Sequence, residues 1–118
     1  MLVLTNIIIA LVALLHIYFL VLEMFLWDKP TGLRVFGQSA EQAAVSKVLA
    51  ANQGLYNGFL AAGLIWGLSL GPSGFSVKLF FLICVIAAGL FGGLTANRKI
   101  LVVQAAPALV GLALLLIF

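Results

Sequence analysis

The chain has 118 residues, of which 65% are hydrophobic and only 8% are charged. A soluble domain needs far more charge to cover its surface, so this composition favours lipid as the surrounding medium. The net charge of +3 comes from scattered basic residues. Nucleic-acid binding needs clustered ones, and we therefore expect no nucleic-acid partner.

The length sets the number of membrane crossings. A spanning helix needs roughly 20 apolar residues, so the chain accommodates four spans in a single domain over residues 1–118. We predict these spans at about 2–27, 45–70, 75–95 and 100–118. The expected fold is all-α: an integral membrane four-helix bundle with antiparallel neighbours and a longer connection between its first two helices.

The first predicted helix runs from Leu2 to Trp27. Trp27 suits a membrane interface, and the helix should stop before Pro30 and Gly32, which favour a reversal of the chain. The segment has no basic N-terminal region and no small-residue cleavage site. We therefore expect a retained span rather than a signal peptide.

The second predicted helix begins in the connection. Ser39 and Gln42 have the spacing of a capping box, so this helix should start near Ala40 and run to about Leu70. Gly71-Pro72-Ser73-Gly74 is a strong helix breaker.

The last two predicted spans are Phe75 to Thr95 and Ile100 to Phe118, with a short turn at residues 97–99 between them. Pro107 lies inside the last span and should kink it by removing one backbone hydrogen bond. The second and third connections are so short that the helices they join should be antiparallel neighbours.

The basic residues indicate an orientation. Lys78 lies alone near the second connection, and the other basic residues lie at the first and third: Lys29, Arg34, Lys47, Arg98 and Lys99. Positive charge concentrates on the cytoplasmic side of membrane proteins. We therefore expect both termini to lie outside the cytoplasm.

The polar side chains inside the predicted spans are the candidate functional residues. Thr5, His16 and Glu23 share one stripe at about 100° per residue, and that stripe should face protein rather than lipid. The full candidate set is His16, Glu23, Asn52, Gln53, Tyr56, Asn57 and Gln104.

Depth groups these residues. At about 1.5 Å per residue, Glu23 lies roughly 6 Å from Trp27, and Asn52 and Gln104 lie roughly 8 Å from Lys47 and Lys99. The predicted polar layer in the cytoplasmic half of the bundle therefore consists of Glu23, Asn52, Gln53, Asn57 and Gln104. His16 lies roughly 10 Å deeper.

Two interpretations of Glu23 stay open. The carboxyl group can be a proton-linked or cation-linked site, or a site for a polar head group. Alternatively it accepts a hydrogen bond from Asn52 or Gln53 and fastens the first two helices together. Tyr56 can likewise anchor the interface or simply pack, and His16 can simply bond one neighbour.

Glycines at four-residue spacing predict close helix contacts, a packing role only. They are Gly54, Gly58, Gly63, Gly67, Gly89 and Gly93. One histidine, Cys84 and one carboxylate within the spans are too few for a dedicated metal site, so we expect neither a metal nor a cofactor.

Several stretches form a recognisable pattern: His16-x-Tyr18, Leu22–Trp27 with Pro30 and Gly32, Phe36-Gly37, and the block Lys47–Gly58. Together they resemble the domain of unknown function 1304 family of small bacterial integral membrane proteins. The resemblance covers essentially the whole chain. It implies a four-span protein of the bacterial cytoplasmic (inner) membrane, and it supplies no activity and no catalytic residue.

Three functions remain open, in this order. The first is a ligand-binding or proton-linked transport protein for a small lipophilic or cationic ligand, surrounded by membrane lipids and favoured as a homo-oligomer because one small bundle has little interior. The second is a structural or accessory membrane subunit. The third is a membrane enzyme acting on a lipophilic substrate, with Glu23 and His16 as acid and base.

Overall fold

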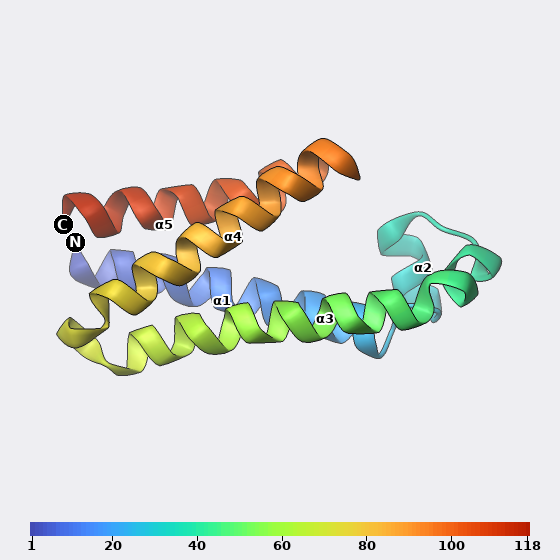
Figure 1. The fold of residues 1–118 in the computed structure, drawn as a ribbon, viewed down its shortest axis with the longest axis horizontal. Helices are drawn as coiled ribbons and strands as arrows, with labels where there is room; N and C mark the ends of the chain where they lie inside the picture. Colours follow the sequence, from blue (N-terminus) through green and yellow to red (C-terminus); the bar gives the residue numbers. More distant parts are fainter. The chain divides into compact units, whose positions relative to one another are not determined.

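The computed structural model describes all residues, 1–118, and every regular element in it is helical (Figure 1). The elements are α1 (Leu2–Met24), α2 (Pro30–Phe36), α3 (Ala40–Ser69), the 3₁₀ turn η1 (Gly71–Gly74), α4 (Phe75–Thr95), the π-helical turn η2 (Leu101–Ala105) and α5 (Ala106–Ile117). The predicted all-α class is confirmed. The chain forms two compact units: unit 1 comprises Met1–Leu14 and Leu60–Phe118, and unit 2 comprises Leu15–Phe59.

The connection after α1 is more ordered than the sequence predicts. α1 ends at Met24 rather than Trp27, and the expected loop contains the short helix α2. Pro30 occupies the first turn of α2, where its fixed φ favours a helix and its missing donor costs nothing. Gly37 ends α2 with a left-handed φ of 61°, and its N–H donates to the carbonyl of Leu33. Pro30 therefore starts a helix as well as following the end of one.

The start of α3 is the predicted one. The Ser39 N–H donates to Oε1 of Gln42 at 2.9 Å, and the Gln42 N–H donates to Oγ of Ser39 at 3.2 Å. This reciprocal capping box satisfies two backbone donors at the helix end, so α3 begins at Ala40.

Unit 1 has an apolar core to which α1, α3, α4 and α5 all contribute. Its buried residues are Ile9, Val12, Ala13, Leu64, Leu82, Val85, Ala108 and Leu115. The two chain ends lie beside each other in this unit (Figure 1), and residues Leu2 and Phe118 line the same cavity.

Glycines set the close helix contacts of unit 1. A Cβ on Gly67 would meet the Lys78 side chain and one on Gly63 would meet the Phe81 ring, so α3 and α4 run antiparallel. A Cβ on Gly89 would meet Ala105. One on Gly93 would meet the side chain of Leu101, so α4 is also antiparallel to the segment that leads into α5.

The predicted kink at Pro107 takes the form of a wider turn. The N–H of Ala106 donates to the carbonyl of Leu101, five residues back, in the π-helical turn η2. Pro107 follows directly and cannot donate. A π turn is one of the few ways in which a helix accommodates such a gap in its ladder.

Two helical stretches are long and apolar enough to cross a membrane, Leu2–Met24 and Gly71–Thr95, and Leu101–Ile117 is a shorter apolar helix. These helices support membrane association. α3 is not among them, and its amide residues Asn52, Gln53 and Asn57 explain why, since carboxamides lower the hydropathy of that stretch.

Candidate functional site

Unit 2 contains a buried carboxyl group joined to a buried amide. Glu23, near the end of α1, is 5% exposed, and Asn57 on α3 is 8% exposed. Nδ2 of Asn57 donates to Oε1 of Glu23 at 2.5 Å. One polar contact therefore links the two long helices within this unit, in surroundings where an unpaired polar group would be costly.

Glycines allow α1 and α3 to approach closely at this point. A Cβ on Gly54 would lie 2.6 Å from Cγ of Met24 and 3.1 Å from Cβ of Glu23. A Cβ on Gly58 would lie 2.7 Å from Cδ1 of Leu20. The pairs run in opposite directions along the two helices, so these parts of α1 and α3 are antiparallel.

The partner of Glu23 differs from the predicted one. Asn52 and Gln53 are exposed, and Nδ2 of Asn52 donates to the Val48 carbonyl of its own helix at 2.9 Å. Side chains in a helix lean toward its N-terminus. The long side chain of Glu23 therefore extends along α1 away from Trp27, toward Asn57 on the antiparallel α3. The prediction that Asn52 or Gln53 bonds Glu23 was wrong because it matched depths at the backbone and ignored this lean.

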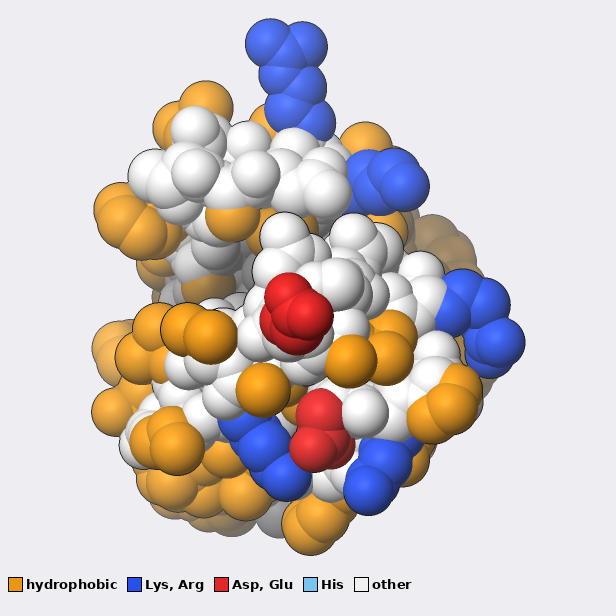
Figure 2. All heavy atoms as spheres, turned by 90° about the vertical axis from the view of Figure 1, so that its right-hand side faces the viewer, with side chains coloured by type: hydrophobic (Ala, Val, Ile, Leu, Met, Phe, Trp, Pro, Cys, Tyr) orange, Lys and Arg blue, Asp and Glu red, His pale blue; other side chains and the backbone are white.

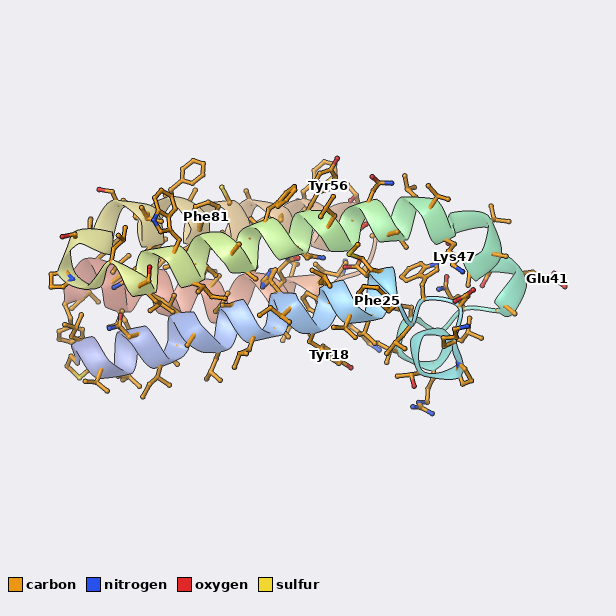
Figure 3. All side chains as sticks on the ribbon, turned by 90° about the horizontal axis from the view of Figure 1, so that it is seen from below. Tyr18, Phe25, Glu41, Lys47, Tyr56 and Phe81 are labelled. Atoms are coloured by element: carbon orange, nitrogen blue, oxygen red, sulfur yellow. The ribbon has the colours of Figure 1, made fainter.

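Tyr56 also lies outside the pair. Its side chain is 60% exposed, its ring contacts that of Phe59 at a centroid distance of 6.1 Å, and it points away from the helices of unit 2 (Figure 3). The structure thus separates the predicted polar layer of unit 2 into a buried pair and an exposed group on the outer face of α3.

His16 and Gln104 are both buried. His16 is fully buried on α1, and its ring lies edge-on to that of Phe19 at a centroid distance of 5.5 Å. Gln104 is 8% exposed in the π-helical turn η2 and belongs to unit 1. Thr5, the third member of the predicted stripe on α1, is 1% exposed.

Charged and polar contacts close the α2 end of unit 2. Nζ of Lys47 lies 2.9 Å from Oδ2 of Asp28, and this hydrogen bond lowers the pKa of Asp28 below its usual value. Nε1 of Trp27 donates to Oγ of Ser46 at 3.1 Å. Figure 2 faces this end of unit 2, where basic and acidic side chains lie among hydrophobic ones. Lys47 therefore pairs with Asp28, and Glu23 keeps a neutral partner.

Unit 1 holds a second buried charged side chain, whose place in the sequence indicated only an orientation in the membrane. Lys78 in the first turn of α4 is 3% exposed, and its Nζ donates to Oδ1 of Asn6 at 3.1 Å. The available signal was a lysine inside an otherwise apolar helix. No group of three or more histidine, cysteine, aspartate or glutamate residues lies together as a metal site would require.

Comparison with known proteins gives a match along nearly the whole chain. Residues 10–116 match the model of a family described as "Protein of unknown function (DUF1304)". The chain belongs to this family. The resemblance expected from the glutamate and asparagine-glutamine-glycine blocks is thereby confirmed. The chain is also similar to "Uncharacterized protein YpaA" of Lactococcus lactis subsp. lactis (strain IL1403), 37% identical over 114 residues, which cover 95% of this chain and 96% of the relative. No solved structure matches the chain.

Proposed function

We propose that this DUF1304 protein is a multi-pass protein of the bacterial inner membrane that binds a proton or a small lipophilic cation at Glu23 and Asn57. In this proposal α1, α3, α4 and the segment from η2 through α5 cross the membrane as one four-helix bundle, with both termini outside. The apolar helices α1 and α4 support a membrane location, and the Lactococcus relative supports a bacterial one.

The observation that carries the proposal is a buried carboxyl group whose partner is neutral. Asn57 donates one hydrogen bond to Glu23 and brings no positive charge. Lys47, a basic residue of the same unit, is held by Asp28. A buried carboxylate is costly without a compensating charge. A proton or a bound cation would supply that compensation, and exchange between the two would couple ligand binding to proton release.

The outer face of α3 suggests what surrounds the site. Large apolar side chains on this face are mostly exposed, with Val45 at 89%, Val48 at 76% and Leu49 at 75%. Exposed apolar area of this kind is stable in lipid or against another apolar surface. We expect membrane lipids, or a second copy of the chain in a homo-oligomer, to cover it.

The test is cation flux into liposomes that contain the purified protein and a pH gradient, with tetraphenylphosphonium as the probe. We expect flux that depends on the gradient in the wild type and its loss in Glu23→Gln, which keeps the size of the side chain. Glu41→Gln is the matched control, because Glu41 is an exposed glutamate of the same unit. Equal, pH-dependent flux in Glu23→Gln and Glu41→Gln would contradict the proposal.

A second candidate is a structural or accessory subunit, which the bond between Asn57 and Glu23 also favours. In that function the pair only fastens α1 to α3. The accessory subunit would then show no flux in any variant, while Glu23→Gln would still change the stability of the protein.

A further inference from the structure

We propose that unit 1 contains a separate binding site for a single-chain anionic amphiphile, a molecule with one acyl chain and a carboxylate-type head, at Lys78. The site lies in a cavity of about 350 Å³ that Lys78 lines together with the ends of α1, α4 and α5. All of these segments belong to unit 1. The inference is independent of the function proposed for Glu23.

The site carries a buried positive charge. Lys78 is 3% exposed, and its hydrogen-bond partner, Asn6, is neutral. The three acidic residues of the chain, Glu23, Asp28 and Glu41, all belong to unit 2. Unit 1 therefore has no acidic side chain that could pair with Lys78, and the ion pair of the structure joins Lys47 and Asp28 in unit 2. A buried basic group without a counter-charge is costly, and a bound anion would supply that charge.

The position of Lys78 along its helix adds to this argument. It lies in the first turn of α4, which begins at Phe75. The N-terminal end of a helix carries a partial positive charge, so a basic side chain there is unfavourable by itself. The same end attracts an anion, and the backbone N–H groups that lack helical partners can donate to it. The lysine and the helix end would therefore act on one anionic head together.

Close packing holds the lysine in this place. A Cβ on Gly67 would lie 2.9 Å from Cγ of Lys78 and 3.1 Å from its backbone nitrogen. Gly67 therefore leaves room for the stem of the lysine between α3 and α4. The hydrogen bond to Asn6 then fixes the amino group toward α1.

The rest of the cavity selects an apolar tail. Its walls include the hydrophobic side chains Leu2, Phe75, Leu115 and Leu116. Small-molecule sites have volumes of roughly 300–1,000 Å³, so this cavity is at the lower end of the range. It suits a head group and the start of one chain, and it is small for a phospholipid with two chains. A bound amphiphile would place its carboxylate on the charged Lys78 and its apolar tail along these hydrophobic walls.

The experiment is native mass spectrometry of the full chain, released from detergent in the presence of palmitate. We expect one palmitate per chain in the wild type. Lys78→Met should weaken binding at least about tenfold, since it removes a charge-assisted hydrogen bond. Lys99→Gln is the matched control, because it removes one exposed basic charge from the same unit and should bind palmitate as the wild type does. Hexadecanol, which has the same chain and an uncharged head, should bind at least about tenfold more weakly than palmitate.

A second variant covers the case in which Lys78→Met does not fold. Leu116 is 60% exposed and lines the cavity, so Leu116→Trp should fill it while Lys78 stays in place, and palmitate binding should be lost. Palmitate binding at wild-type strength in both Lys78→Met and Leu116→Trp would overturn the proposal. Equal binding of hexadecanol and palmitate would also overturn it, as would retention of a two-chain phosphatidylglycerol in place of palmitate.

Discussion

At the scale of single residues, the hydrogen-bonded pair of Glu23 and Asn57 is also the proposed binding site. A carboxyl group and an amide that satisfy each other are tolerable when buried, and either one left alone is expensive. The two residues should therefore show a coupling free energy in unfolding measurements, whether or not a ligand is bound.

A double-mutant cycle would measure that coupling free energy. Glu23→Leu and Asn57→Leu should each destabilise the protein, because each leaves the other partner unsatisfied. The double variant leaves no unsatisfied partner, so it should cost less than the sum of the single changes by about 1–3 kcal/mol. Unfolding in detergent by a denaturant gives the free energies. In the control cycle, Asn52→Leu should be additive with Glu23→Leu, since Asn52 bonds its own helix. A similar coupling in both cycles would show that Asn57 is not the specific partner.

Gly54 gives the second prediction at this scale. Gly54→Ala should destabilise the protein by about 1–3 kcal/mol, because the new methyl group would press on Met24 and on Cβ of Glu23. Gly111→Ala is the control, since the nearest atom to its Cβ would be 3.5 Å away, at an ordinary contact distance. That change should be neutral or stabilise α5 by up to about 1 kcal/mol. Thermal unfolding of the two variants gives the comparison, and Gly54→Ala as stable as Gly111→Ala would refute the close contact.

At the scale of elements, the connection between α1 and α3 is fastened by the ion pair of Asp28 and Lys47. The hydrogen bond from Lys47 lowers the pKa of Asp28 from its ordinary 3.8 in the folded chain. The stabilisation from this carboxylate is therefore present above pH 3.8 and is lost as the pH falls through the lower folded value. The pair is exposed, so its effect should be small and should weaken with salt.

The expected result is a small decrease in the melting temperature of Asp28→Asn at pH 7, and no difference from the wild type once the pH is low enough to protonate Asp28 in the folded protein. Thermal melts at a series of pH values give the measurement. Glu41→Gln should show no such decrease, because Glu41 forms no ion pair. An Asp28→Asn difference that persists at low pH would indicate a cause other than the ion pair.

Local signals in the sequence predicted most element ends. Ser39 and Gln42 placed the start of α3, and the glycine-proline run before Phe75 placed the start of α4. The helix α2 was missed because Pro30 was taken only as a stop, although proline in a first turn favours a helix. The π turn before Pro107 could not be predicted, because a kink has several local forms.

The candidate site was predicted less completely. The burial of Glu23 followed from the stripe that it shares with His16, since a regular helix brings such residues to one face. Its partner depends on the register between α1 and α3 and on the lean of two side chains, neither of which a sequence states. Lys78 was missed as a buried group because its burial depends on packing against Gly67 of the neighbouring helix and on a hydrogen bond to Asn6, which is 72 residues away in the chain.

At the scale of the whole molecule, the proposed topology requires α3 to cross the membrane, although its amides make it less apolar than α1 and α4. In the proposed topology the residues before and after α3 lie on opposite sides. With Cys84 replaced by alanine, single cysteines can be placed at Ser39, Ser73 and Asn97. A membrane-impermeant maleimide should label Ser73→Cys in intact cells and leave Ser39→Cys and Asn97→Cys unlabelled until the cells are opened. Labelling of Ser39→Cys and Ser73→Cys from the same side would refute a crossing by α3.

In the proposed function, a cation and a proton compete for the carboxyl group of Glu23. Infrared difference spectroscopy of the protein in lipid, with and without tetraphenylphosphonium, observes that group directly. We predict that the cation changes the carboxyl stretching band, that the change is absent in Glu23→Gln, and that it is unaltered in Glu41→Gln. An identical difference spectrum in Glu23→Gln and the wild type, or no carboxyl change on cation binding, would contradict competition at Glu23.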